Sequence, residues 1–155
     1  MKSKRIWTAN IKITAFDSDG NIKDVQEFKN LLVTTGLGMV IDAWQTAAFD
    51  SEIKDMALGD GSAAPDLTDT TLGNETYRMV FTSQTEVTAT SLLSVAVVPA
   101  ADAVGLTEEI GWFAGVNADG VGPDTGILVS RVLYNRTKTA LESLQIERTD
   151  TIAEA

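Results

Sequence analysis

The stretch WTANIKITAFDSDGN, residues 7–21, decides the fold class. Its apolar side chains occupy every second position and alternate with polar ones, and they are Trp7, Ala9, Ile11, Ile13 and Ala15. This is the pattern of a strand with one buried face. Residues 17–21 form a cluster of turn-forming residues in which Gly20 can adopt a positive φ. Residues 22–32 then return as a second strand, so the sequence predicts an N-terminal β-hairpin.

A single helix is predicted next, over about residues 37–49. Its apolar residues recur at helical spacing and are Leu37, Val40, Ile41, Trp44 and Ala48. Such a stripe is typical of an amphipathic helix that packs on a core, so we expect Trp44 to be buried. Thr34 or Thr35 can cap the first turn.

From residue 53 onward the chain reads as β structure. Short strands are expected at 53–58, 77–85, 87–98, 106–116, 127–134 and 144–152. Polar loops at 59–71 and 117–126 separate some of them. The sequence therefore predicts a mainly β protein, an antiparallel β-sandwich or jelly-roll-like fold with one helix. We expect a basic N-terminal arm or strand at 1–16, a single domain at 17–152 and a short tail at 153–155.

The composition excludes several kinds of chemistry. The 155 residues include neither Cys nor His. Disulfides, thiolate metal sites, a Ser-His-Asp triad and imidazole acid–base catalysis are therefore impossible. The stretch 92–106 is apolar but too short to span a bilayer. We expect no enzymatic activity, no cofactor, no metal and no contact with a membrane.

The charge is distributed unevenly along the chain. The formal net charge is −10, yet residues 1–16 contain Lys2, Lys4, Arg5 and Lys12 and no acid. The strong negative charge of the remainder argues against nucleic acid as a partner, because that binding relies on cations that neutralise phosphates. A basic segment on an acidic body can instead lie on an acidic neighbour. Lys2, Lys4, Arg5 and the nearby aromatic residue Trp7 are therefore candidate contacts with another protein chain.

A further candidate contact is Trp112. It is adjacent to Phe113 on a predicted strand, and successive side chains of a strand point to opposite faces. One of the two should face outward, where another element or another subunit would have to cover it.

The charged residues of the strands and of the loop 59–71 offer two interpretations, structural ion pairs and a metal site. Arg78 and Arg131 lie within predicted strands and can pair structurally with acids such as Glu75 or Glu109. Three aspartates of the loop 59–71 could together hold a divalent ion, and they are Asp60, Asp66 and Asp69. Solvated loop acids are the favoured interpretation of these three residues.

An ordered series of motifs resembles small bacteriophage virion proteins. It consists of KNLLV at 29–33 with Gly36, ALGDG at 57–61, Pro65, DTTLGNE at 69–75, Arg78, TEEIGWF at 107–113, GILVSRVL at 126–133 and TKT at 137–139. The chain departs from the family at Trp112, where the family usually has Leu, and in the charged loop 117–124. The resemblance covers about residues 22–152.

The resemblance implies a phage structural protein without enzymatic activity. Our leading hypothesis is a head decoration (cement) protein, made in the host cytoplasm and bound to the outer capsid surface. Its partners would be the major capsid protein and other copies of itself, with a trimer as the expected oligomer. The first alternative is a tail fibre or baseplate component with an attachment role. The second is a calcium-dependent carbohydrate-binding β-sandwich using the three loop aspartates.

Overall fold

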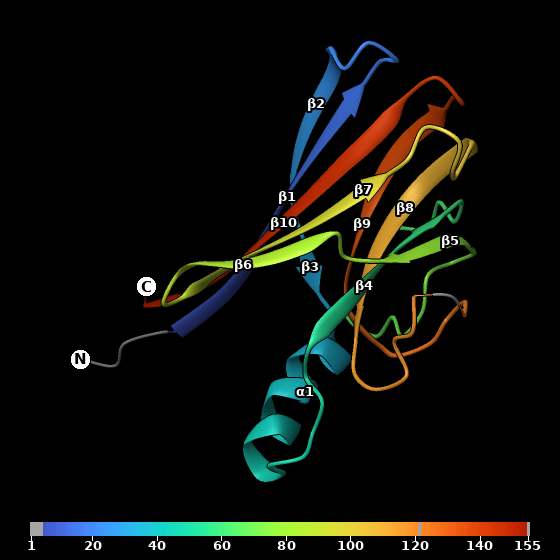
Figure 1. The fold of residues 1–155 in the computed structure, drawn as a ribbon. Coiled ribbons are helices and arrows are strands. Elements are labelled where there is room, and N and C mark those ends of the chain that lie inside the picture. Colours follow the sequence, from blue (N-terminus) through green and yellow to red (C-terminus); the bar gives the residue numbers. More distant parts are fainter. Residues whose placement is uncertain (1–4, 121, 155) are drawn as a thin grey trace. The chain divides into compact units, whose positions relative to one another are not determined.

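The computed structural model describes residues 5–120 and 122–154, which form ten strands and one helix (Figure 1). The elements are β1 (Arg5–Phe16), β2 (Ile22–Lys29), β3 (Leu31–Leu32), α1 (Thr34–Gln45), β4 (Ile53–Gly59), β5 (Glu75–Val80), β6 (Ser83–Thr88), β7 (Ser91–Val98), β8 (Gly105–Ala114), β9 (Ile127–Lys138) and β10 (Ser143–Glu154). They make two antiparallel sheets, which confirms the predicted mainly β class with a single helix.

The contacts within the chain divide it into two compact units. Unit 1 contains the described residues of segments 1–30, 81–102 and 140–155. Unit 2 contains those of segments 31–80 and 103–139. Each unit contains one sheet and is described by itself, and the single domain over 17–152 stays a prediction.

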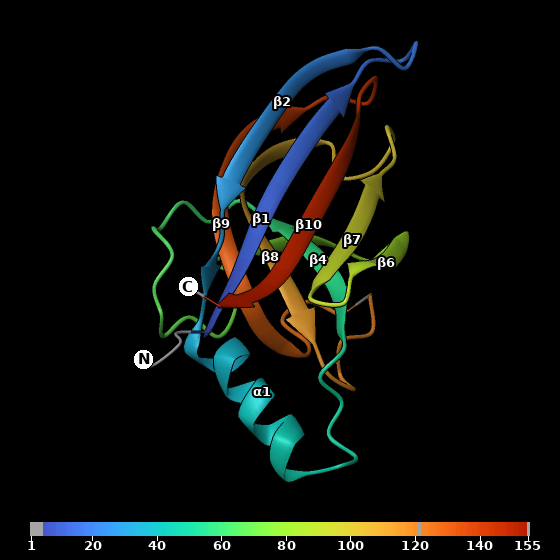
Figure 2. The same ribbon diagram turned by 90° about the vertical axis from the view of Figure 1, so that its left-hand side faces the viewer.

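Unit 1 contains sheet A, in the strand order β2-β1-β10-β7-β6. Figures 1 and 2 show β10 in the middle of this sheet, between β1 and β7. The register of β1 with β10 runs from Arg5 opposite Glu154 to Phe16 opposite Ser143. The first and last described strands are therefore partners along their whole length, and the predicted tail is strand as far as Glu154.

The predicted N-terminal hairpin is confirmed as β1 and β2. Apolar residues of β1 are buried in alternation, as the period-two pattern indicates, and they are Ala9, Ile11, Ile13 and Ala15. In the turn, Gly20 has a φ of 83°, and the Oδ1 of Asp17 accepts the N–H groups of Asp19 and Asn21 at 2.9 Å each. These hydrogen bonds, foremost that from Asn21, lower the pKa of Asp17. The second strand ends at Lys29, three residues earlier than predicted.

Unit 2 contains sheet B, in the order β3-β9-β8-β4-β5, together with α1. β8 is the central strand, and its residues are buried almost continuously from Thr107 to Ala114. A cluster of buried apolar side chains combines residues of β4, β8 and β9 with residues outside the strands, and it consists of Val33, Ala57, Leu72, Phe113, Ala118 and Leu128. Loop residues Leu72 and Ala118 thus help to form the core of this unit.

One strand boundary differs in a way that changes the topology. The sequence predicts one strand at 77–85, but β5 ends at Val80 and β6 begins at Ser83. β5 belongs to sheet B and β6 to sheet A. The chain changes sheets at residues 81–82, where neither Gly nor Pro marks a break.

The orientation predicted for the helix is wrong. α1 buries Gly36 and Met39, whereas Leu37, Ile41 and Trp44 are 46%, 49% and 79% exposed. A Cβ at Gly36 would lie 2.3 Å from the carbonyl oxygen of Val129, so the glycine allows the helix backbone to approach β9 closely. Glycine at that point fixes which side of the helix is covered, and Leu37, Ile41 and Trp44 remain on the exposed side.

The cap predicted for this helix is also wrong. Val33 occupies the N-cap position, and no side chain caps the first turn. The hydroxyl of Thr35 instead donates to the carbonyl oxygen of Leu128, at 2.8 Å. This hydrogen bond ties the start of the helix to β9.

Candidate functional site

The predicted contact residues of the basic segment are described only in part. Lys2 and Lys4 lie outside the described residues, and Arg5 opens β1 without a described side chain. Trp7 lies on β1 of unit 1, partly buried, and its indole N–H donates to the Oδ1 of Asp150 at 2.8 Å. Its role as a contact with another chain stays a prediction.

Asp150 is also held by a buried arginine of the same strand. Nε and one terminal nitrogen of Arg148 donate to the two carboxylate oxygens of Asp150, both at 2.7 Å. Arg148 is 0% exposed and Asp150 8%. The acceptor of the Trp7 hydrogen bond is therefore a carboxylate that Arg148 already neutralises. This hydrogen bond holds the indole ring near the N-terminal end of β1.

The prediction that either Trp112 or Phe113 faces outward is wrong. Both side chains are 0% exposed. The prediction assumed one solvated face, but on the Phe113 side the core cluster includes Leu72 and Ala118 from outside the strands. A register shift between Trp112 and Phe113 further disturbs simple alternation. Trp112 thus has no exposed surface to offer to a capsid or a second subunit.

A buried carboxylate, Glu109 of β8, lies where several of the sequence motifs of unit 2 meet. Its oxygens accept hydrogen bonds from the backbone N–H groups of Gly61, Gly73 and Asn74, at 3.0, 3.1 and 3.0 Å. The Nε of Arg131 donates to the same carboxylate at 2.8 Å. Glu109 is 0% exposed, so four donors replace the water it has lost.

Three glycines allow the loop 59–74 to lie against this carboxylate. A Cβ at Gly59, Gly61 or Gly73 would lie 2.7, 2.3 or 3.2 Å from the Oε1 of Glu109. Larger residues at the first two positions would displace the carboxylate or the loop. The glycines of the ALGDG and DTTLGNE motifs therefore serve this contact.

Arg131 extends the network to the far part of the same loop. Its terminal nitrogens donate to the Oδ2 of Asp69 and to the carbonyl oxygen of Ala63, both at 2.6 Å. The side chain is 3% exposed. The sequence predicts that Arg131 pairs with an acid such as Glu75 or Glu109, and the structure shows Glu109 as its partner. Together these groups fasten the loop to β8 and β9.

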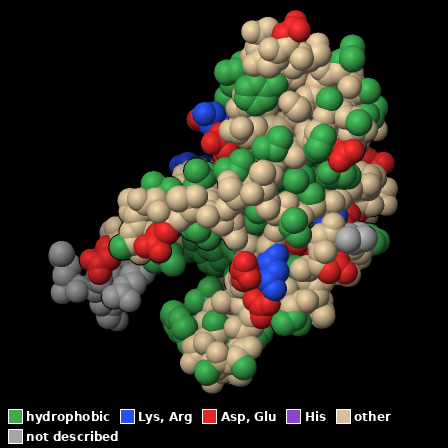
Figure 3. Space-filling model, viewed as in Figure 1, with side chains coloured by type: hydrophobic (Ala, Val, Ile, Leu, Met, Phe, Trp, Pro, Cys, Tyr) green, Lys and Arg blue, Asp and Glu red, His purple; other side chains and the backbone are tan. Residues whose placement is uncertain are grey.

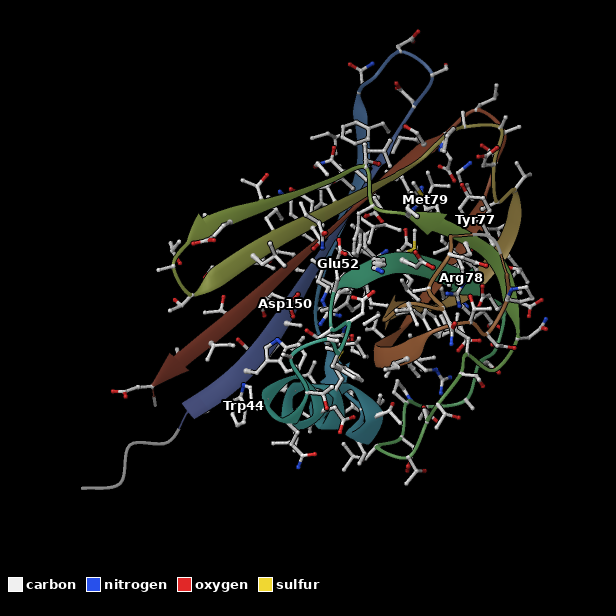
Figure 4. All side chains as sticks on the ribbon, turned by 60° about the horizontal axis from the view of Figure 1, so that its bottom comes forward. Trp44, Glu52, Tyr77, Arg78, Met79 and Asp150 are labelled. Carbon is white, nitrogen blue, oxygen red and sulfur yellow. The ribbon has the colours of Figure 1, made fainter. Side chains whose placement is uncertain are left out.

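A second buried network surrounds Arg78 of β5, which Figure 4 shows on this strand beside Tyr77 and Met79. Nε and a terminal nitrogen donate to the two oxygens of Glu75 at 2.7 and 2.8 Å. The remaining terminal nitrogen reaches Asp55 at 3.1 Å and the carbonyl oxygen of Thr125 at 2.8 Å. The guanidinium also lies 4.0 Å from the ring centre of Phe113. Of the two acids considered for Arg78, the structure shows Glu75 as its partner.

This network also binds the loop 117–126. Asp55 accepts the N–H of Gly120 at 2.8 Å, and Glu75 accepts the N–H of Asp124 at 2.9 Å. Burial disfavours the charged form of Arg78, but Glu75 and Asp55 outweigh it and raise the pKa of the guanidinium. At Asp124, desolvation and the charge of Glu75 raise the pKa of the carboxyl group.

The aspartates considered for calcium have separate partners. Asp60 accepts from the side-chain amide of Asn74 at 2.6 Å, and Asp66 accepts from the N–H and hydroxyl of Thr68 at 2.8 and 2.6 Å. Asp69 pairs with Arg131. Within residues 5–120 and 122–154, no three acidic groups lie close enough to hold a metal ion.

Sheet A carries a shallow groove of about 530 Å³. Charged residues of β1, β2 and β10 line part of it, and they are Lys12, Glu27, Lys29 and Glu147. Lys12 lies 3.8 Å from Glu147 and directly opposite Glu27 in the sheet register. The two lysines and two glutamates of the groove therefore largely neutralise one another.

The exposed face of α1 is the feature that the sequence interpretation missed. Leu37, Ile41 and Trp44 lie at positions i, i+4 and i+7 and so share one side of the helix. Trp44 projects outward from α1 in Figure 4, and hydrophobic side chains appear on the surface of the helix in Figure 3. Leu67, 53% exposed, lies at the start of the helix, where its carbonyl oxygen accepts the N–H of Thr34. We call these four residues the apolar stripe.

A signal for this orientation was present in the sequence. Gly36 and Met39 are three positions apart, and a glycine inside a helix often marks a close backbone contact. The more hydrophobic side was taken as the covered one, which is the usual rule but not the case here.

The chain has no match among family models, curated proteins or solved structures. In the described part of the chain, no helix is long and apolar enough to cross a membrane.

Proposed function

We propose that this protein is a structural protein of a bacteriophage particle. In this proposal it binds the outer surface of the head as a decoration (cement) protein, in contact with the major capsid protein and with copies of itself. The observation that carries the proposal is the convergence of the virion-like motifs on one buried network. Gly61, Gly73, Glu109 and Arg131 come from four separate motifs and meet around one carboxylate.

The chemistry of this network favours a structural task. Arg131 is paired with Glu109 and Asp69 in this network, and Arg78 is paired with Glu75 and Asp55 in the second one. The first network holds the loop 59–74 against sheet B, and the second holds the loop 117–126. Buried networks of paired charges rigidify a protein and specify one arrangement, although Oδ1 of Asp55 has no hydrogen-bond partner here. A rigid domain that displays fixed loops is what a protein of a particle surface requires.

The charge distribution supports a position on the outer surface of the head rather than inside it, next to the nucleic acid. Unit 2 contains five basic and twelve acidic residues, a formal charge of −7. A surface of this sign is repelled by nucleic acid and suits the outside of a particle. A basic segment that reaches a neighbouring acidic copy would join subunits, and each such contact is strengthened by the others of the lattice.

Electron microscopy of purified particles labelled with antibodies against this protein tests the proposal. We expect label over the whole head, as with a control antibody against the major capsid protein. Label confined to the tail would overturn head decoration in favour of the fibre or baseplate alternative. Purified particles without label would overturn a virion role altogether.

A further inference from the structure

We propose that β6, an edge strand of sheet A, pairs in antiparallel orientation with β6 of a second copy across a two-fold axis. The A sheets of the two copies would then join into one continuous sheet through main-chain hydrogen bonds. The inference deepens the self-contact of the proposed function, on which it rests to that extent, and it names the strand that makes the contact.

β6 is an edge strand that is exposed along its whole length. It pairs with β7 on one side, and in the described part of the chain no strand pairs with its other side (Figures 1 and 2). All six of its residues are exposed. Alternate residues of an edge strand direct their N–H and C=O groups away from the sheet, and these groups can bind the backbone of a further strand.

β6 lacks the residues that usually protect an edge strand from other chains. Lys and Pro are typical of protected edges, and the sequence of β6, SQTEVT, contains neither. β2, the opposite edge of sheet A, carries exposed Lys23 and Lys29. The pairing of β6 with β7 shifts register only between Glu86 and Thr88, near the end of the strand. β6 is therefore the edge of sheet A that is better suited to accept a partner strand.

Charge complementarity identifies β6 of a second copy as the partner strand and sets the register. Two-fold pairing that keeps the faces of both sheets aligned places one residue of β6 opposite itself on the axis. With Glu86 on the axis, two carboxylates would oppose each other, which is unfavourable. With Thr85 on the axis, Gln84 lies opposite Glu86 of the second copy on both sides.

This second register matches the side chains of the two strands. Gln84 and Glu86 project from the same face of β6, since they lie opposite Ser94 and Leu92 of β7. Each amide donor of one copy would thus meet a carboxylate acceptor of the other on that face. With Gln84 on the axis instead, fewer residues of β6 overlap and the carboxylate has no matching donor. The sequence of β6 is therefore complementary to its own reverse when Thr85 is central.

The contact closes after two copies, so it makes a dimer in place of the trimer expected from the sequence resemblance. A single pair of short strands is a small contact, and we expect a dissociation constant of about 10–100 μM. On a particle, many such contacts would act together and strengthen one another.

Disulfide cross-linking of purified protein tests the register directly, because the chain contains no cysteine. Across the proposed axis, the two Cα atoms of a Thr85→Cys dimer would be about 4.5–5.5 Å apart, within the range of a disulfide. We expect mild oxidation to convert this variant into a covalent dimer. Ser83→Cys is the register control, since its two copies would be separated by four residues, or about 13 Å. Val25→Cys, exposed on β2, controls for random collision.

A charge-swap experiment tests the same contact without a covalent bond. Thr85→Lys and Thr85→Glu each place like charges on the axis and should weaken dimerisation about 10-fold or more, measured by sedimentation equilibrium over about 5–500 μM. An equal mixture of the two variants should form a heterodimer, because Lys then lies opposite Glu. The same two substitutions at Val25 should leave association unchanged. Thermal unfolding of each variant checks that the exposed substitutions leave the fold intact.

Three outcomes would overturn the inference. They are a wild type that stays monomeric at the highest concentration, a Thr85→Cys protein that cross-links no more than the two cysteine controls, and the absence of a heterodimer in the mixture.

These outcomes are independent of the localisation experiment. Antibody label over the head with failed cross-linking would retain the proposed function and remove only this contact. Cross-linking through residue 85 without label on particles would retain the contact and remove the virion role.

Discussion

Glu109 shows how one side chain can stabilise a whole loop. It is completely buried and accepts hydrogen bonds from three backbone groups and Arg131. Glu109→Gln leaves the arginine with less compensating charge and places amide hydrogens against backbone donors. We expect the free energy of unfolding to fall by about 3–5 kcal/mol, as for other broken buried pairs.

Urea unfolding followed by tryptophan fluorescence measures this change. Glu108→Gln is the matched control, since the adjacent carboxylate is partly exposed and accepts only a hydrogen bond of 3.2 Å from Asn135. The control should change the unfolding free energy by less than about 0.5 kcal/mol. Equal effects of the two substitutions would contradict the central role of Glu109.

The negative charge of Asp124 lowers the stability of the folded protein. Its φ is 55°, and desolvation together with the charge of Glu75 raises the pKa of its carboxyl group. A carboxyl group with a raised folded-state pKa destabilises the protein increasingly as the pH rises above the unfolded value of 3.8. Asn tolerates this backbone conformation and carries no charge.

We therefore expect Asp124→Asn to raise the melting temperature at pH 7 and to have no such effect at pH 3. The gain should stay below about 1 kcal/mol, because the side chain is largely exposed and solvent screens it. Calorimetry at both pH values measures it. Asp42→Asn is the control for a general reduction of negative charge, and an equal gain from it would refute the local explanation.

At the scale of elements, two glycines of α1 have opposite roles. A Cβ at Gly36 would lie 2.3 Å from the carbonyl oxygen of Val129, while a Cβ at Gly38 would meet nothing within 4 Å. Gly38→Ala should therefore stabilise the protein by about 0.5–1 kcal/mol through the better helix propensity of Ala.

Gly36→Ala should instead be destabilising, because the helix or β9 must move to accommodate the methyl group. Chemical unfolding of the two variants side by side provides the comparison, and each is the control for the other. A stabilising Gly36→Ala would mean that the helix is not held against β9 by this contact.

A comparison of the elements with their predictions shows which structural features sequence patterns can predict. The alternation of β1 predicted its strand and buried face correctly, because every residue between its apolar positions 9, 11, 13 and 15 is polar. The position of Arg78 and Arg131 within strands predicted that they pair with acids such as Glu75 or Glu109, but not which arginine takes which acid. Trp112 and α1 were misjudged, since periodicity does not reveal which face loops or a close backbone contact will cover. The change of sheets at 81–82 left no turn signal.

At the scale of the whole molecule, sheet A depends on its central strand. β10 hydrogen-bonds to β1 on one side and β7 on the other, so its removal separates the N-terminal hairpin from β7 and β6. We expect deletion of residues 143–155 to abolish cooperative unfolding. Deletion of 153–155, the control, removes only the last two described positions of the pairing with β1 and should cost little.

Circular dichroism during urea titration distinguishes the two deletions. The shorter one should keep a single sharp transition, and the longer one should show a broad change or none. A sharp transition of the longer deletion at the wild-type midpoint would show that sheet A forms without β10.

The position of β10 also sets the order in which the protein can be completed during translation. Of the described strands, β1 is synthesised first. It can pair with β2 early, but its other neighbour, β10, is synthesised after every other strand of the two sheets. Until then β1 and β7 each present an unpaired edge, which invites proteolysis or aggregation. A nascent chain that stops before β10 therefore cannot close sheet A, and its hairpin and its β6–β7 pair remain separate.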